Sequence, residues 1–191
     1  MEVTALKNVI HIFGPSGSGT TTLGEKICRV LGYVLMDTDD YFWMPTDPKF
    51  TAKRPAADRI CLMRRDMEKS QNVVISGSLT DWGDVLIPSF TLAIRIEMEQ
   101  SLRLERIRQR EQRKFGSRIE PGGDMYETHR AFMEWAKSYD TGGPEIRSRR
   151  KHDQWQTLLS CPVLLLDGDD TVEANYQKVL QFMKQEGMLA P

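Results

Sequence analysis

The stretch that decides the fold is Val9-Ile-His-Ile-Phe13 followed by Gly14-Pro-Ser-Gly-Ser-Gly19-Thr20-Thr21-Thr22. Its first part is a short apolar strand, and its second part is a glycine-rich turn that opens a helix. Glycine permits backbone conformations that side chains forbid, so several peptide N–H groups can point at one anion in front of the helix N-terminus. The stretch therefore predicts a phosphate-binding loop. A glycine turn without a ligand is the alternative.

The spacing of this loop matches the pattern G-x-x-x-x-G-K-[ST] at every position except one. Gly14 and Gly19 have the required separation, and Thr21 is the hydroxyl residue that would bind Mg²⁺. Thr20 stands where the pattern has lysine. We expect the loop to bind nucleotide phosphates with altered electrostatics, through Gly14, Pro15, Ser16, Gly17, Ser18, Gly19, Thr20, Thr21 and Thr22.

Composition limits the classes of partner. The chain has 191 residues, enough for a single domain, and its net charge of −1 argues against nucleic acid as a partner. Basic residues gather at 103–118 and 147–151, which suits a small polyanion better than a long one. The three cysteines form no C-x-x-C pair, and no segment resembles a signal peptide or a membrane span. We expect a cytoplasmic protein without a membrane partner; the oligomeric state stays open.

Apolar strands alternate with amphipathic helices, which predicts an α/β fold with a mainly parallel sheet. The strands are expected at 9–13, 33–36, 73–75, 90–96 and 163–166. Helices are expected at 20–31, 56–70, 99–114, 124–139, 145–159 and 172–186, with a short helix or turn at 82–88 and a proline-broken loop at 41–50. Ligands of such sheets bind at the carboxyl ends of the strands, so the segments that follow the strands are expected to form the site.

Two carboxylates, Asp37 and Asp39, follow the second expected strand. If the extended conformation continues, one carboxylate can face the phosphate site while another caps the following segment. A solvated acidic turn is the alternative. The third expected strand ends in Ser76-Gly77-Ser78 without a carboxylate, so the metal's outer shell would come from Asp37, Asp39 or Asp81.

The loop at 14–24 and the Asp37-x-Asp39 pair resemble the nucleoside-monophosphate and shikimate-type kinases of the P-loop superfamily. The resemblance implies a three-layer P-loop NTPase fold with strand order 2-3-1-4-5, in one domain over 1–191 with a lid at about 108–124. By position, Asp37 would serve Mg²⁺ together with Thr21, and Asp39 would hold the acceptor and act as general base. The segment 40–42 is also similar to uridine-kinase-like enzymes, so the acceptor class stays open.

Motifs along nearly the full length resemble a bacterial adenylate kinase-like group that has threonine in place of the loop lysine. They lie at 14–24, 37–41, 45–48, 76–78 and 122–125. The helix at 99–114 and the segment after it resemble the lid of this superfamily. Arginines of this region would replace the missing charge, and the candidates to reach the transferred phosphate are Arg110, Arg113 and Arg118. A solvated charged helix is the alternative. For the second basic cluster, at 147–152, contact with solvent is favoured over contact with a phosphate.

The acceptor would bind beside the strand ends, where the resemblance and the residue types favour Asp37, Asp39, Tyr41, Trp43, Arg54 and Ser78. The function expected is transfer of the γ-phosphoryl group from ATP, or another NTP, with Mg²⁺ to a hydroxyl or phosphate of a small molecule. Because Thr20 replaces the lysine, the alternative is a nucleotide-binding protein with little transferase activity that acts as a nucleotide-dependent regulator or interaction module.

Overall fold

A computed structural model describes residues 8–189 and contains one five-stranded parallel sheet in the order β2-β3-β1-β4-β5. The predicted strand order is therefore confirmed. The strands are β1 (Val9–Phe13), β2 (Val34–Asp37), β3 (Val73–Ser76), β4 (Leu92–Glu97) and β5 (Val163–Asp167). The expected strand at 9–13 agrees at both ends, and the other strands begin or end one or two residues from the expected positions.

The helices alternate with these strands. They are α1 (Thr20–Leu31), α2 (Thr38–Phe42), α3 (Ala56–Glu68), α4 (Gln100–Phe115), α5 (Tyr126–Lys137), α6 (Arg149–Gln156) and α7 (Val172–Gln185), with the 3₁₀ turns η1 (Asp84–Ser89) and η2 (Gly116–Ile119). None of the helices in the described part of the chain has the length and hydropathy that a membrane span requires.

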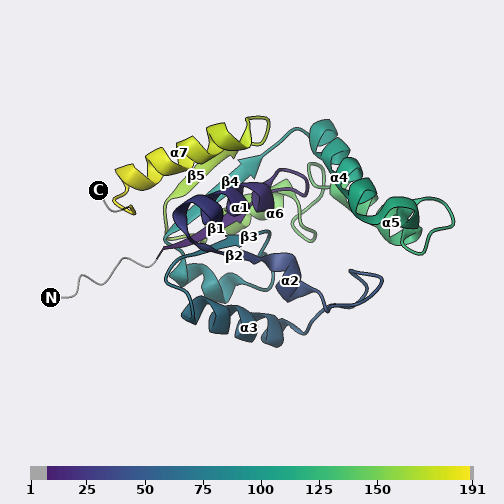
Figure 1. The fold of residues 1–191 in the computed structure, drawn as a ribbon, viewed down its shortest axis with the longest axis horizontal. Coiled ribbons are helices and arrows are strands. Elements are labelled where there is room, and N and C mark those ends of the chain that lie inside the picture. Colours follow the sequence, from purple (N-terminus) through teal and green to yellow (C-terminus); the bar gives the residue numbers. More distant parts are fainter. Residues whose placement is uncertain (1–7, 190–191) are drawn as a thin grey trace.

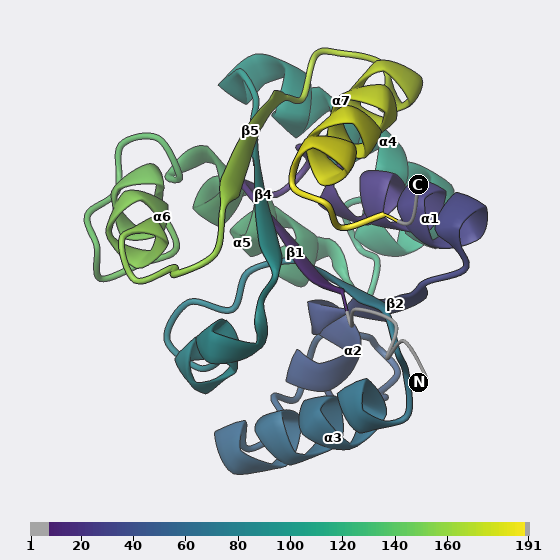
Figure 2. The ribbon, with the colours of Figure 1, turned by 90° about the vertical axis from the view of Figure 1, so that its left-hand side faces the viewer.

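Two hydrophobic cores cover the two faces of the sheet. Ile10 and Ile12 of β1 pack with α1 and α7 on one face, and Val9 and Phe13 pack with α3, η1 and α6 on the other. Figures 1 and 2 show α1 and α7 lying together on one side of the strands, with α3 and α6 on the other side. Both faces of β1 are therefore buried, as in other sheets with helices on both sides. This burial fixes the register that aligns the carboxyl ends of the strands.

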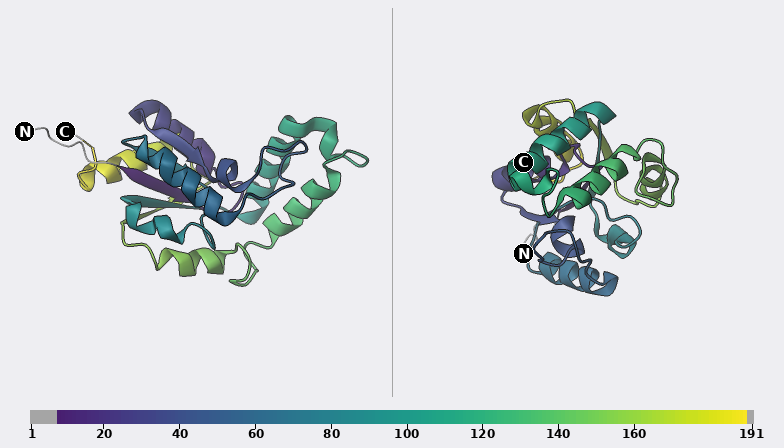
Figure 3. Two further views of the ribbon diagram at one scale, coloured as in Figure 1. Left: turned by 90° about the horizontal axis from the view of Figure 1, so that it is seen from below. Right: turned by 90° about the vertical axis from the view of Figure 1, so that its right-hand side faces the viewer.

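Helices α4 and α5 extend away from the sheet as an arm (Figure 3). A third apolar cluster, formed by Leu104, Ile107, Met133 and Ala136, holds the two helices together. The base of the arm is fixed by Arg103, which is fully buried and donates to the Asp140 carboxylate at 2.6 Å. A buried arginine with a carboxylate partner avoids the cost of an unpaired charge.

Three local expectations are wrong. Residues 38–42 form helix α2 instead of extending β2, because the Asp37 carboxylate accepts the backbone N–H of Asp39 at 3.0 Å and caps the helix. The helix expected at 124–139 begins at Tyr126, and the Asp124 carboxylate before it binds Arg118. The basic helix expected at 145–159 begins at Arg149, so Arg147 lies in the segment before α6.

Candidate active site

The glycine-rich loop has the geometry of an anion cradle. Gly17 and Gly19 have φ angles of +87° and +96°, which side chains rarely adopt. A Cβ atom at Gly17 would also collide with the backbone carbonyl oxygen of Arg103, so the loop lies directly against α4. The first turn of α1 contains no acidic residue, and the buried Ser18 hydroxyl has no hydrogen-bond partner among the described residues. These features fit a bound phosphate group.

The ends of two strands meet the start of α1 beside this loop. The Thr21 hydroxyl lies 3.1 Å from the Asp37 carboxylate, to which it donates, and 3.1 Å from the Ser76 hydroxyl. Asp37 and Ser76 are paired residues of the neighbouring strands β2 and β3. The structure thus brings Thr21 and Asp37 together, as the metal hypothesis requires. Asp81, another carboxylate considered for the metal shell, binds Lys151 instead at 2.6 Å.

The donors at this point suit Mg²⁺ better than a transition metal. Thr21, Asp37 and Ser76 offer oxygen atoms alone. Residues 8–189 contain no group of three or more His, Cys, Asp or Glu side chains able to hold a metal ion. Mg²⁺ usually takes one or two protein carboxylates together with substrate phosphates and water, so it does not need such a cluster.

The Asp39 carboxyl group lies next to this triad and accepts no hydrogen bond from residues 8–189. Its pKa is raised by desolvation and then by the neighbouring Asp37 charge, while Arg147 and Arg110 act in the opposite direction. The cations of two distant segments therefore act on this carboxyl. A carboxylate without protein partners and with a raised pKa is suited to accept a proton from a substrate hydroxyl.

Two of the expected acceptor residues have structural partners. The Tyr41 hydroxyl donates to Asp66, and the pKa of Tyr41 is raised to about 12 by burial and by that carboxylate. The Arg54 guanidinium donates to the carbonyl oxygens of Tyr41 and Trp43 at 3.0 and 3.3 Å, so it joins the two ends of the loop after α2.

Ser78 and Trp43, the remaining expected acceptor residues, also make internal contacts. Ser78 is buried, and its hydroxyl contacts Thr80 and the ring of His152. Trp43 forms an isolated bridge with Lys53 and packs edge-on against Phe42 at 5.0 Å. Whether either of these side chains touches an acceptor stays a hypothesis.

Arg59 is a candidate that the sequence expectations missed. Its guanidinium lies 3.8 Å above the ring centre of Phe42 and 5.5 Å from the ring centre of Trp82. Phe42 belongs to α2, the helix that carries Asp39. Arg59 is 8% exposed and forms no ion pair with a described carboxylate. The spacing of Arg59 could have indicated its burial: Arg59, Met63 and Met67 recur every fourth residue, so they share the buried face of α3.

The three lid arginines contact other groups than the phosphate loop. The Arg110 guanidinium binds Glu111, Arg113 donates to the backbone of Gln109, and Arg118 binds Asp47 and Asp124. None of the three makes a hydrogen bond to residues 14–22 within the described range 8–189. Arg106, from the same helix, donates to the carbonyl oxygen of Gly168 at 3.0 Å. In this arrangement, none of these three arginines supplies the positive charge that the loop lacks.

A different arginine reaches the loop. The Arg147 guanidinium donates to the Ser16 hydroxyl at 2.7 Å. The sequence pointed to the basic cluster at 147–152 as a possible phosphate contact but favoured contact with solvent. The contact depends on where the chain turns before α6, and that turn carries no short sequence motif.

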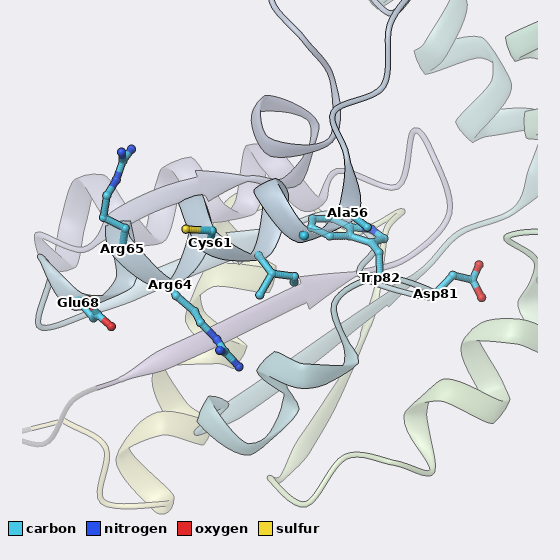
Figure 4. A pocket seen from close by; sticks show the side chains of 9 residues that line it. Ala56, Cys61, Arg64, Arg65, Glu68, Asp81 and Trp82 are labelled. Carbon is cyan, nitrogen blue, oxygen red and sulfur yellow. The ribbon is translucent and has the colours of Figure 1, made fainter.

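An open groove of about 690 Å³ lies on α3 away from the loop, and no residue of 14–22 lines it. Figure 4 shows Arg65 and Glu68 at one end of this groove and Trp82 and Asp81 at the other. Trp82 links this groove to Arg59, because it lines the groove and its ring lies beside the Arg59 guanidinium.

Comparison with known proteins yields a relative along nearly the whole chain. The chain is 39% identical over 178 residues to the uncharacterized protein YqaC of Bacillus subtilis (strain 168), which covers 93% of this chain and 98% of that protein. It is 30% identical over 113 residues to the cytidylate kinase of Archaeoglobus fulgidus, covering 53% of this chain and 61% of that enzyme. No family model matches the chain.

Solved structures show the same fold. The shikimate kinase from Bacteroides thetaiotaomicron superposes with a TM-score of 0.57 at 15% identity, covering 93% of this chain and 98% of that one. This likeness establishes the fold of the P-loop kinases and confirms the resemblance to nucleoside-monophosphate and shikimate-type kinases.

Proposed function

We propose, from the premise that the chain belongs to the same family as YqaC of Bacillus subtilis, that it is a kinase for a small anionic acceptor. The γ-phosphoryl group would come from ATP or another NTP with Mg²⁺. The observation that carries the proposal is the meeting of three groups at one sheet edge: the phosphate cradle, the Thr21–Asp37–Ser76 triad and the unpartnered Asp39 carboxyl. Phosphoryl transfer requires positioning and charge neutralisation, and these groups supply sites for both.

In this mechanism the backbone N–H groups of residues 14–22 bind the donor phosphates. Thr21 and Asp37 would hold Mg²⁺, which neutralises phosphate charge when bound. Asp39 accepts the proton of the acceptor hydroxyl as that oxygen bonds to the γ-phosphorus and the bond from phosphorus to the β–γ bridging oxygen breaks. A phosphate acceptor would react through an oxygen that carries no proton, and Asp39 would then only orient it.

The anionic character of the acceptor is inferred from Arg59. This guanidinium lies against α2, which carries Asp39, and it has no carboxylate partner in residues 8–189. Burial and the neighbouring Arg54 lower its pKa, so an anion placed here would relieve an unfavourable charge. A carboxylate or phosphate on the acceptor would bind Arg59 in two-point fashion. The segment 108–124 would act as a lid that carries Arg110, Arg113 and Arg118 toward the transferred phosphate.

The test is an ATP-consumption screen over nucleosides, nucleoside monophosphates, hydroxy acids and sugar acids, with ADP release as the readout. We expect acceptor-dependent ADP release for an acceptor that carries a carboxylate or phosphate. Arg59→Gln should raise the KM of that acceptor. Arg65→Gln, on the same helix and exposed at 58%, is the matched control. Release that needs no acceptor, or that occurs equally with neutral sugars, would refute the anionic-acceptor proposal.

The second candidate function is a nucleotide-binding protein with little transfer activity. The observation that favours it is Thr20, which leaves the loop itself without a cationic side chain. Tight Mg·ATP binding together with no turnover across the whole acceptor panel would support this candidate against the kinase.

A further inference from the structure

The phosphate loop has no lysine at position 20, yet a cationic side chain touches it from elsewhere in the chain. We propose that Arg147 supplies the fixed positive charge that the loop lacks and binds the phosphate chain of the nucleotide. The proposal rests on the proposed function, because it names the residue that completes the donor site. It gives Arg147 the role of replacing the missing charge, which was expected of the lid arginines.

The first observation is the contact itself. Arg147 Nη2 donates to the hydroxyl of Ser16, in the middle of the loop, at 2.7 Å. The guanidinium carbon lies 4.3 Å from the ring centre of Trp135, which supports the flat face of the cation. A guanidinium has five N–H donors, and the bond to Ser16 occupies one of them. The other donors make no hydrogen bond to residues 8–189.

The second observation is the missing counter-charge. Arg147 forms no ion pair within residues 8–189, and its buried Nε has no hydrogen-bond partner there. Its neighbours behave differently: Arg149 pairs with Glu97 and Asp140, and Lys151 pairs with Asp81. Burial lowers the pKa of Arg147 while the nearby Asp39 opposes that change. A desolvated cation without a carboxylate partner is costly unless a ligand supplies the anion.

The third observation is rigidity. Ser148 is fully buried; its hydroxyl donates to the Gly143 carbonyl at 2.7 Å and accepts the Lys151 N–H at 3.1 Å. The backbone N–H of Arg149 donates to the Tyr139 carbonyl at 2.8 Å. These bonds fix the two residues that follow Arg147 before any ligand arrives. A charge that needs no rearrangement to meet developing phosphate charge is the kind that lowers reaction barriers most.

Two substitutions separate charge from packing. Arg147→Lys keeps a positive charge but loses the planar guanidinium with its paired N–H donors. Arg147→Met keeps an apolar side chain against Trp135 but loses the charge. We expect Arg147→Met to weaken binding of Mg·ATP and Mg·GTP about 10- to 100-fold by calorimetry, and Arg147→Lys to weaken it less than about fivefold. Binding of adenosine or guanosine should change less than about twofold. The exposed Arg150→Met, three residues further along in the first turn of α6, is the matched control and should bind like the wild type.

A double-mutant cycle with Thr20→Lys tests whether a lysine at position 20 can replace the charge of Arg147. Thr20→Lys restores the lysine pattern, so Arg147→Met should cost less than about fivefold in Mg·ATP affinity in that background. Equal losses for Lys and Met at position 147, or an unchanged Arg147→Met loss in the Thr20→Lys background, would overturn the role of Arg147. If the wild-type protein binds no Mg·ATP or Mg·GTP, the proposed function and this inference both fail. If it binds them without any transfer, the affinities still test Arg147 alone.

Discussion

The phosphate loop has two sides that differ in how they are built. On the strand side, Thr21, Asp37 and Ser76 meet because the parallel register places the ends of β2 and β3 next to the start of α1. On the helix side, Arg147 arrives from the segment between α5 and α6, far along the chain. The first arrangement follows from local pattern and strand order. The second depends on a turn held by buried hydrogen bonds, and patterns of residue type do not encode it.

The two sides also differ in charge. The strand side collects carboxyl and hydroxyl oxygens, which suit a metal ion, whereas the helix side presents a cation without a counter-ion in the described chain. Between them lies Asp39, whose pKa responds to Asp37 on one side and to Arg147 on the other. The difference suggests a division of labour, in which one side binds metal and the other binds phosphate directly. Substitutions on each side should therefore have separable effects.

The largest effect is expected at the group between the two sides. Asp39→Asn removes the proton acceptor while keeping the shape of the side chain, so acceptor-dependent turnover should fall about 10²- to 10⁴-fold. Affinity for Mg·ATP should stay within about threefold. The measurement is steady-state ADP release together with calorimetric nucleotide binding.

Asp40→Asn, at the next and exposed position of α2, is the control for this experiment and should turn over at close to the wild-type rate. A normal rate for Asp39→Asn would remove Asp39 from the mechanism. An equal loss in both variants would point to a change in helix α2 instead.

The next effect concerns the histidines beneath the site. His11 and His152 are buried, and desolvation lowers their pKa values from 6.5 to about 4 and about 2. Both are neutral in the fold, whereas the unfolded chain binds protons below pH 6.5, so their stabilising contribution is complete above that pH and is lost as the pH falls. Each contributes about 1.4 kcal/mol per pH unit below pH 6.5. The free energy of unfolding should fall by about 3–4 kcal/mol between pH 7 and pH 5, measured by urea denaturation.

His152 lies on the helix side, where its ring contacts Ser78 and the Tyr139 hydroxyl, whereas His11 lies in β1. Substituting His152 alone therefore isolates its share of the pH dependence. In His152→Gln the pH-dependent loss between pH 7 and pH 5 should be about half that of the wild type. The variant is also expected to be less stable at pH 7, because the buried contacts change. A full-sized pH dependence in this variant would show that His152 is not the group responsible.

The same contrast explains what could be predicted from the sequence. The position of α1 follows from the apolar run and the glycine spacing before it, whereas the strand order and the pairing of Thr21 with Asp37 were implied by the resemblance to P-loop kinases. The helix position, the strand order and the Thr21–Asp37 contact all appear in the structure. The short helix after Asp37 was not expected, because it begins at a single carboxylate–amide bond. Arg59 was missed, and solvent contact was favoured for the cluster with Arg147, because stacking on Phe42 and on Trp135 places these two arginines. Such contacts join segments that are distant in sequence.

A smaller effect is expected on the strand side. Thr21→Ala removes the hydroxyl that binds Asp37, so affinity for Mg·ATP should fall about 10- to 30-fold, on the scale of a hydrogen bond to a charged group. Affinity for metal-free ATP, measured in excess chelator, should change about threefold or less. Arg29→Gln, exposed in the last turn of the same helix, is the control. Equal losses with and without Mg²⁺ would refute the metal role of Thr21.

The smallest effect is expected among the lid arginines, and it decides whether the helix side has a second cation. Arg110 already acts on Asp39 electrostatically, whereas Arg118 is held at the surface by Asp47 and Asp124. Arg110→Gln should therefore reduce turnover about twofold to fivefold, the size of a solvent-screened charge interaction, and Arg118→Gln should reduce it less. Raising the salt concentration should shrink the Arg110 effect further, because screening weakens exposed charges first. A larger, salt-resistant loss in Arg118→Gln would instead mean that this arginine leaves its two carboxylates and binds the transferred phosphate when the segment 108–124 closes.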